Sequence, residues 1–291
     1  MLKYHSLAEL SDLCLTKDKE MWEIVLQAEL DESERTAEES TGKMLKMYQA
    51  MKSADQLYDG NLRSGSKQAG GDGALLQQYN ESGQNICGDF IGKVMEKAIK
   101  MGESNACMRR IVAAPTAGSC GVLPAVLLSY AEDYNVDDEK MIHALYIAAG
   151  IGKVIAENAS IAGASGGCQA EIGSASAMAA GALTYLQGGD STAIIHGAAL
   201  ALKNFLGLVC DPVGGLVEVP CIKRNSYGAV NAVVSSQLVM AGIRSAISPD
   251  DVIDSMKRIG NQMPACLKET SQGGLAVTES AKKYMEGSLM N

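Results

Sequence analysis

The sequence has few aromatic side chains and few prolines. Two Phe, one Trp and ten Tyr make up 4% of the 291 residues, and six residues are Pro. β-Sandwiches and barrels rely on aromatic and β-branched side chains for their packed faces, whereas Ala, Leu and Met favour helices. The composition therefore argues against an all-β protein and predicts a mostly α-helical one.

Long apolar runs and blocks of basic charge are also missing. The first residues carry Lys3, Glu9 and other charges, so they contain no apolar core of an export signal. The longest uncharged stretch, 111–131, is interrupted by Pro115 and Pro124, which argues against a membrane span. With a net charge of −9, binding to nucleic acid or to an anionic membrane is disfavoured. We expect a cytoplasmic protein with small-molecule or protein partners.

Two common cofactor motifs are absent as well. Neither a GxGxxG fingerprint nor a GxxxxGK[ST] loop occurs, so NAD and ATP are not expected. The segment GASGG at 163–167 could hold a phosphate, but the nearest lysines, Lys153 and Lys203, have no context for a Schiff base. Pyridoxal phosphate is therefore not expected.

The apolar pattern predicts an all-α, multi-helix fold. Residues 6–57 carry amphipathic stripes at helical spacing, and the polar, Gly-rich segment 59–73 predicts a loop. We divide the chain into N-terminal amphipathic helices (1–58) that pack on a main domain (59–291). Only three charged residues occur in 158–206, where Ala, Gly and Ser dominate. This stretch predicts closely packed, buried helices at the centre of the fold.

Three Gly-rich and Cys-bearing loops are predicted between the buried helices, at 114–121, 163–171 and 210–225. They contain four of the eight cysteines: Cys120, Cys168, Cys210 and Cys221. There is no CxxC pair, and structural disulfides are disfavoured in the cytoplasm. Cys168, Cys210 and Cys221 stand beside Gly or Pro, which is typical of metal ligands. From the residues alone, packing thiols, a zinc site and an iron–sulfur cluster with one iron free of protein ligands all remain open.

Four longer motifs carry a resemblance to a known family. They are RIVAAPTAGSCGVLPAVL (110–127), GASGGCQAEIGSASAMAAGAL (163–183), CDPVGGLVEVPCIKRNSYGAVNAV (210–233) and LKETSQGGLA (267–276). They closely resemble the catalytic α region of the iron–sulfur-dependent L-serine dehydratases. The resemblance implies a lyase of serine degradation and gluconeogenesis that converts L-serine to pyruvate and ammonia. It also implies a [4Fe–4S] cluster on Cys168, Cys210 and Cys221, with the fourth iron open to substrate.

That family contains fused single chains and two-subunit enzymes. This chain lacks the Ser- and His-containing loop of the β part, so the resemblance implies a separate β chain and a hetero-oligomer. Two alternatives remain open at this point. One is an iron–sulfur L-cysteine desulfidase, or another amino-acid lyase, with the same α domain, and the other is a non-catalytic metal-binding subunit.

The remaining site candidates are less well defined by their sequence context. Glu171, Lys223 and Lys268 are candidate catalytic residues, although we favour a loop-holding role for Glu171. Backbone amides of 116–119 or 165–167 could bind the substrate carboxylate. The side-chain candidates for substrate binding are Thr116, Ser119, Ser165, Arg224 and Asn225. Gln169 and Asn225 could also donate hydrogen bonds to cluster sulfurs. The three histidines are given no catalytic role.

Overall fold

The computed structural model describes residues 1–289, and helices dominate this part of the chain. It contains thirteen α-helices and no strand over these residues, apart from an isolated bridge between Cys210 and Lys268. The all-α prediction is therefore confirmed. The helices are α1 (Leu7–Lys17), α2 (Met21–Glu32), α3 (Ala37–Gln56), α4 (Asp72–Glu81), α5 (Asp89–Ala106), α6 (Val122–Tyr134), α7 (Asp138–Asn158), α8 (Gly163–Gly166), α9 (Ser174–Leu186), α10 (Ser191–Lys203), α11 (Cys221–Met240), α12 (Pro249–Gln262) and α13 (Glu279–Leu289).

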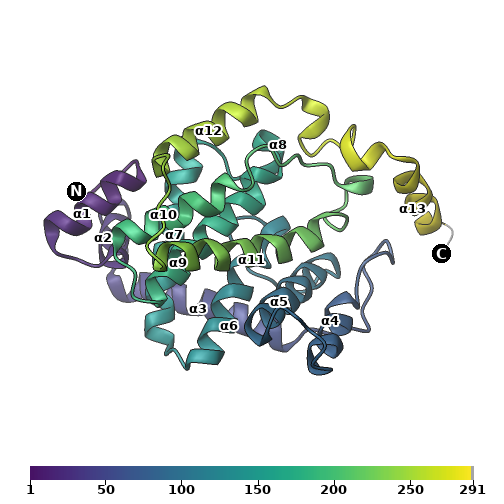
Figure 1. The fold of residues 1–291 in the computed structure, drawn as a ribbon, viewed down its shortest axis with the longest axis horizontal. Helices are drawn as coiled ribbons and strands as arrows, with labels where there is room; N and C mark the ends of the chain where they lie inside the picture. The colour runs from purple at the N-terminus through teal and green to yellow at the C-terminus, as the bar shows by residue number, and fades with distance from the viewer. Residues whose placement is uncertain (290–291) are drawn as a thin grey trace.

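Helix α9 forms the centre of the molecule (Figure 1). All of its residues, SASAMAAGALTYL, are buried, and it packs against α6, α7, α10 and α11. Small side chains allow these helix axes to approach closely. The charge-poor stretch 158–206 thus supplies the central helices, as the composition predicts.

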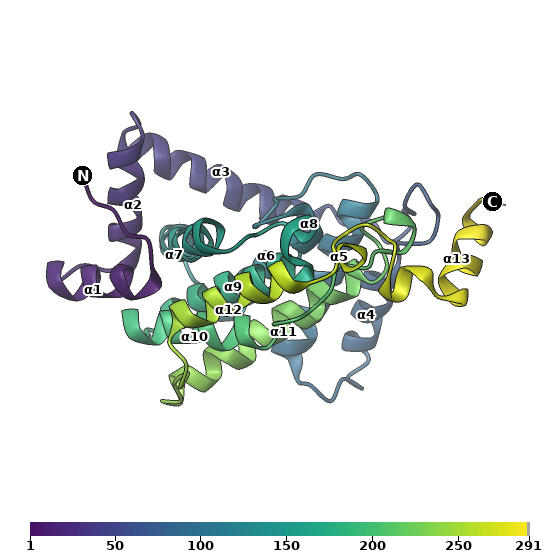
Figure 2. The same cartoon turned by 90° about the horizontal axis from the view of Figure 1, so that it is seen from above.

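Helices α1 and α2 lie at one end of the molecule, and α3 runs from α2 toward its middle (Figure 2). Helix α1 packs on α10, and α2 and α3 pack on α7. Their apolar residues Leu7 and Ile24 belong to the same hydrophobic core as α7 and α9. Ser40 Oγ on α3 also lies 2.6 Å from the hydroxyl of Tyr146 on α7. The division at residues 58 and 59 stays a prediction.

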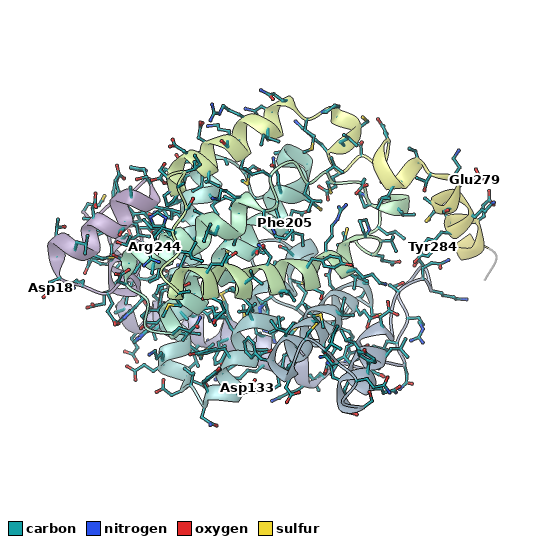
Figure 3. All side chains as sticks on the ribbon, in the orientation of Figure 1. Asp18, Asp133, Phe205, Arg244, Glu279 and Tyr284 are labelled. Carbon is teal, nitrogen blue, oxygen red and sulfur yellow. The ribbon has the colours of Figure 1, made fainter. Side chains whose placement is uncertain are left out.

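The C-terminal segment runs back over the cysteine-bearing loops. Helix α12 packs on α8 and α10, and the chain then passes through turns to α13, at the opposite end from α1 (Figure 1). Figure 3 labels Glu279 and Tyr284 at this end, far from Asp18. Tyr284 exchanges two 3.0 Å hydrogen bonds with Gln68. None of the helices in residues 1–289 has the length and apolar character needed to cross a membrane.

Candidate functional site

The three cysteines of interest come from three different elements. Cys168 directly precedes a π-helical turn, Gln169–Gly173, that continues into α9. Cys210 lies at the bridge with Lys268, and Cys221 is the first residue of α11. The predicted loops at 163–171 and 210–225 are thus partly helical, because α8 and the π turn occupy the first and α11 begins inside the second. π-Helical turns are frequent at functional sites.

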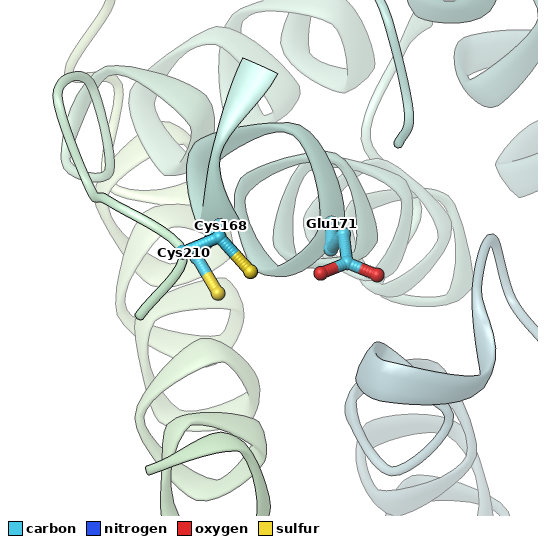
Figure 4. A group of neighbouring side chains, drawn as sticks. All are labelled: Cys168, Glu171 and Cys210. Atoms are coloured by element: carbon cyan, nitrogen blue, oxygen red, sulfur yellow. The ribbon is translucent and has the colours of Figure 1, made fainter. Parts of the chain in front are cut away.

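Cys168, Cys210 and Glu171 bring their side chains together (Figure 4). One donor atom from each of them lies within 4.8 Å of the other two. Gly163 lies against this group, since a Cβ at this position would come 2.7 Å from Glu171 Oε2 and 3.2 Å from Cys210 Sγ. The close approach of this backbone explains the glycine, and the group has the composition of a metal-binding site.

The neighbouring thiols of Cys168 and Cys210 shift each other's pKa. The Cys210 thiol lowers the pKa of Cys168 by hydrogen bonding to its sulfur, and the nearby Arg224 guanidinium lowers it further. The same hydrogen bond, together with burial, raises the pKa of Cys210. Metal ligation requires the thiolate form, so binding of a metal by this pair would be coupled to loss of thiol protons.

Cys221 lies just outside the close group but within its electrostatic reach. Burial, followed by the negative charge of Cys168, raises the pKa of Cys221 to about 12. Cys221 begins α11, and Cys168 begins the helical segment that leads into α9. The positive end of a helix dipole favours a thiolate at such positions. At Cys221 burial outweighs this effect, because the pKa of its thiol is raised.

Glu171 connects the cysteines to the turn that carries Thr116 and Ser119. Thr116 Oγ1 donates a 2.8 Å hydrogen bond to Glu171 Oε1 and lies 3.1 Å from Ser119 Oγ. Burial raises the pKa of Glu171, although the Thr116 hydrogen bond opposes this shift. The loop-holding interpretation of Glu171 agrees with these contacts.

Asn225 and Gln169 hold backbone segments around the cysteines. Asn225 Oδ1 accepts from Gly121 N at 2.8 Å, and its Nδ2 donates to the carbonyls of Gly118 and Cys221 at 2.9 Å. Gln169 donates to Met256 O at 3.0 Å and accepts from Gly207 N at 2.9 Å. Asn225 therefore fixes the start of α11 against the Thr116–Ser119 turn.

The other candidates from the sequence lie in different surroundings. Lys223 Nζ contacts Asp72 Oδ2 at 2.5 Å, and its side chain is 57% exposed. Ser165 is exposed, and the amides of residues 165–167 already donate to the carbonyls of Ala162 and Gly163. Lys268 is half-buried and lies beside Cys210 through the backbone bridge. Of these residues, the structure brings only Lys268 next to a candidate cysteine.

Sequence reasoning did not identify Asp211 or Gly163 as site residues. Asp211 is buried and forms an ion pair with Arg224 at 2.9 Å, and Arg224 also donates to Cys168 Sγ at 3.3 Å. The sequence places Asp211 directly after Cys210 and Gly163 at the start of the GASGGC segment. These positions do not reveal which distant residues Asp211 and Gly163 contact.

Comparison with known proteins gives a consistent result. The family model described as serine dehydratase alpha chain matches residues 16–276. A probable L-serine dehydratase alpha chain of Bacillus subtilis is 44% identical over 281 residues, covering 94% of both chains. The L-serine dehydratase alpha chain of Peptoniphilus asaccharolyticus is 41% identical over 276 residues, again covering 94% of both.

A longer relative matches over the same region. The L-serine dehydratase of Helicobacter pylori is 36% identical over 287 residues, which cover 94% of this chain but 62% of the relative. The residues around Cys168, Cys210 and Cys221 all fall within the matched family region. The chain therefore belongs to the serine dehydratase alpha chain family.

Proposed function

We propose that this chain is the catalytic α subunit of a cytoplasmic L-serine dehydratase that converts L-serine to pyruvate and ammonia. The observation that carries the proposal is the meeting of the Cys168, Cys210 and Glu171 donor atoms within 4.8 Å, with Cys221 nearby. The names and the extent of the similar α chains support the same reaction.

The donor set fits a [4Fe–4S] cluster. Cys168, Cys210 and Cys221 are buried, each comes from a separate element, and soft thiolate ligands are those that such clusters use. A Cβ at position 163 would collide with Glu171 Oε2, so the glycine lets the backbone lie close to Glu171 and Cys210. We propose that these three cysteines hold the cluster.

Dehydration of serine requires loss of the Cα proton and departure of the hydroxyl group. When bound, a cluster with three protein thiolates supplies an open iron, a Lewis acid for the departing oxygen. We propose that the Thr116–Ser119 turn binds the substrate carboxylate. The amides of 165–167, Thr116 and Ser119 donate within their own turns, so the proposed donors are the amides of Ala117 and Gly118. Glu171 and Asn225 hold that turn against the cysteines. Elimination gives aminoacrylate, which tautomerises and hydrolyses to pyruvate and ammonia.

We further propose that a separate β chain completes the enzyme. The similar proteins of Bacillus subtilis and Peptoniphilus asaccharolyticus are named alpha chains, whereas the Helicobacter pylori relative is longer than this chain. We assign the removal of the Cα proton to the assembled enzyme rather than to a histidine of this chain.

Cysteine variants test the ligand assignment. Cys168→Ala, Cys210→Ala and Cys221→Ala should each lose bound iron and sulfide after anaerobic reconstitution, since each removes one thiolate. Cys87→Ala is the matched control, because Cys87 is exposed. Equal metal retention in all four variants would refute the assignment.

A substrate panel tests the reaction. The reconstituted α chain, assayed with a candidate β chain, should release pyruvate and ammonia from L-serine. L-Threonine and L-cysteine should be poorer substrates. Release of sulfide from L-cysteine with no turnover of L-serine would instead identify a desulfidase.

A further inference from the structure

Arg224 is engaged by three acceptors of the cysteine loops. Its Nη1 donates to Cys168 Sγ at 3.3 Å and to Val209 O at 3.0 Å, and its Nη2 donates to Asp211 Oδ1 at 2.9 Å. The side chains of Arg224 and Asp211 are 13% and 4% exposed. A planar guanidinium fixed in this way has a defined orientation. Arg224 is therefore directed at a candidate ligand sulfur and at an internal carboxylate.

Asp211 extends this arrangement to the C-terminal segment. Its second oxygen, Oδ2, accepts a 2.8 Å hydrogen bond from Leu275 N. The neighbouring backbone is paired too, since Cys210 N donates to Leu267 O and Cys210 O accepts from Glu269 N. The loop that carries Cys210 is thus held by the segment 267–275 on one side and by Arg224 on the other.

Arg224 also lines a surface groove. Phe205, Lys223 and Tyr227 line this groove together with Arg224. The same side chain thus contacts both the groove and Cys168 Sγ.

We propose that Arg224 is a positioning residue that orients the Cys168 thiolate as a cluster ligand and, through Asp211, holds the Cys210 loop beside it. This inference rests on the proposed function. In this role Arg224 does not bind the substrate carboxylate, which was its candidate role from the sequence. A charge-assisted hydrogen bond to a ligand sulfur also stabilises the reduced cluster, because such bonds set the potential of iron–sulfur centres.

The test compares Arg224→Lys and Arg224→Gln with the control Arg258→Gln, all reconstituted anaerobically with iron and sulfide. Arg258 pairs with Asp254 on the surface of α12, and its side chain is 64% exposed. We expect both Arg224 variants to lose the visible absorbance of the cluster in air faster than wild type, because loss of a residue that supports a metal ligand typically lowers metal affinity by about ten-fold or more. The reduction potential should fall in Arg224→Gln, and the KM for L-serine of the remaining holoenzyme should stay unchanged.

A raised KM in Arg224→Gln, with wild-type bleaching rate and potential, would overturn the inference and make Arg224 a substrate-binding residue. Thermal unfolding of the metal-free protein tests the inference even if a variant folds poorly or the chain binds no cluster. Thermal unfolding of Arg224→Gln, Asp211→Asn and the double variant should show that the two changes are not additive. Additive changes would overturn the positioning role, whereas a wild-type protein that takes up no cluster would contradict the proposed function separately.

Discussion

At the scale of single residues, Glu171 has contacts that differ from those of a free catalytic carboxylate. One of its oxygens accepts from Thr116 Oγ1, and the hydroxyl of Ser119 lies next to that donor. Its other oxygen is close to the position that a Gly163 side chain would occupy. These contacts fit a residue that fixes the Thr116–Ser119 turn beside the cysteines.

Substitution of Glu171 separates positioning from acid–base catalysis. Glu171→Gln keeps an oxygen that can accept from Thr116, so it should retain the cluster and most of the kcat. Glu171→Ala should release the turn and lower activity strongly. The measurement is kcat for L-serine together with iron per chain. A loss of about a hundred-fold or more in kcat for Glu171→Gln with full iron content would instead identify an acid–base catalyst.

Protonation of His143 should make the stability of the protein depend on pH, without involving the cysteine site. Its ring stacks on Trp22, the sole tryptophan, with centroids 3.6 Å apart. Burial lowers the pKa of His143, although Glu139 and Glu20 oppose this shift. The unfolded chain therefore binds the proton more readily, and stability should fall as the pH drops below about 6.5.

The matched variant is His143→Phe, which keeps an aromatic ring on Trp22 but cannot titrate. Urea unfolding followed by Trp22 fluorescence should show a smaller loss of stability between about pH 7.5 and about pH 5.5 in this variant than in wild type. An identical loss in both proteins would show that protonation of His143 does not contribute.

At the scale of elements, the buried helices contain serines in two different situations. Ser174 Oγ on α9 and Ser129 Oγ on α6 are buried and have no hydrogen-bond partner among the described residues. Ser176 Oγ, by contrast, donates to Gly228 O at 2.8 Å and accepts from Asn231 Nδ2 at 2.9 Å. A buried hydroxyl stabilises a helix interface only when it is paired.

Ser174→Ala should raise the free energy of unfolding by about 1 kcal/mol, because it removes an unpaired buried hydroxyl. Ser176→Ala should lower it by a similar amount, since it removes one hydrogen bond from Gly228 O and one from Asn231 Nδ2. Urea denaturation of both variants measures the difference. A destabilised Ser174→Ala would mean that its hydroxyl is paired in solution.

The C-terminal segment offers a second test at this scale. Gly274 has φ +58°, and a Cβ there would come 2.5 Å from Asp211 Oδ2. Gly274→Ala should therefore displace Asp211 from Leu275 and accelerate bleaching of the cluster in air. Gly242→Ala is the control, because Gly242 has φ +90° with no atom within 4 Å of a Cβ. It shares the backbone strain without the clash, so equal bleaching of the two variants would exclude a role for the Asp211 contact.

The amount of structure predictable from sequence differs between the core and the site. The charge-poor composition was enough to predict the buried helix α9, because burial of small apolar residues follows from composition. The start of α11 was missed, since CIKRN has no apolar period and its half-buried Arg224 and buried Asn225 are held by polar contacts to loops. For the same reason the outward direction of Lys223 could not be predicted without the helix register.

At the scale of the whole molecule, the cysteine loops lie where the central helices meet the returning C-terminal segment. Cys168 leads into the central helix α9, Cys221 begins α11, and Cys210 is bridged to Lys268. A metal centre here would join elements that are distant in sequence. Loss of the metal should therefore loosen the segment 267–275 more than the N-terminal helices, and hydrogen exchange of the loaded and metal-free proteins would measure this difference.

The most direct test of the central claim is the iron and acid-labile sulfide content per chain, measured with the visible spectrum on anaerobically prepared protein. The account predicts about four iron atoms and about four sulfides per chain, with a broad brown absorbance, as expected for a [4Fe–4S] centre. Zinc without sulfide, or no metal at all after reconstitution with iron and sulfide, would contradict it.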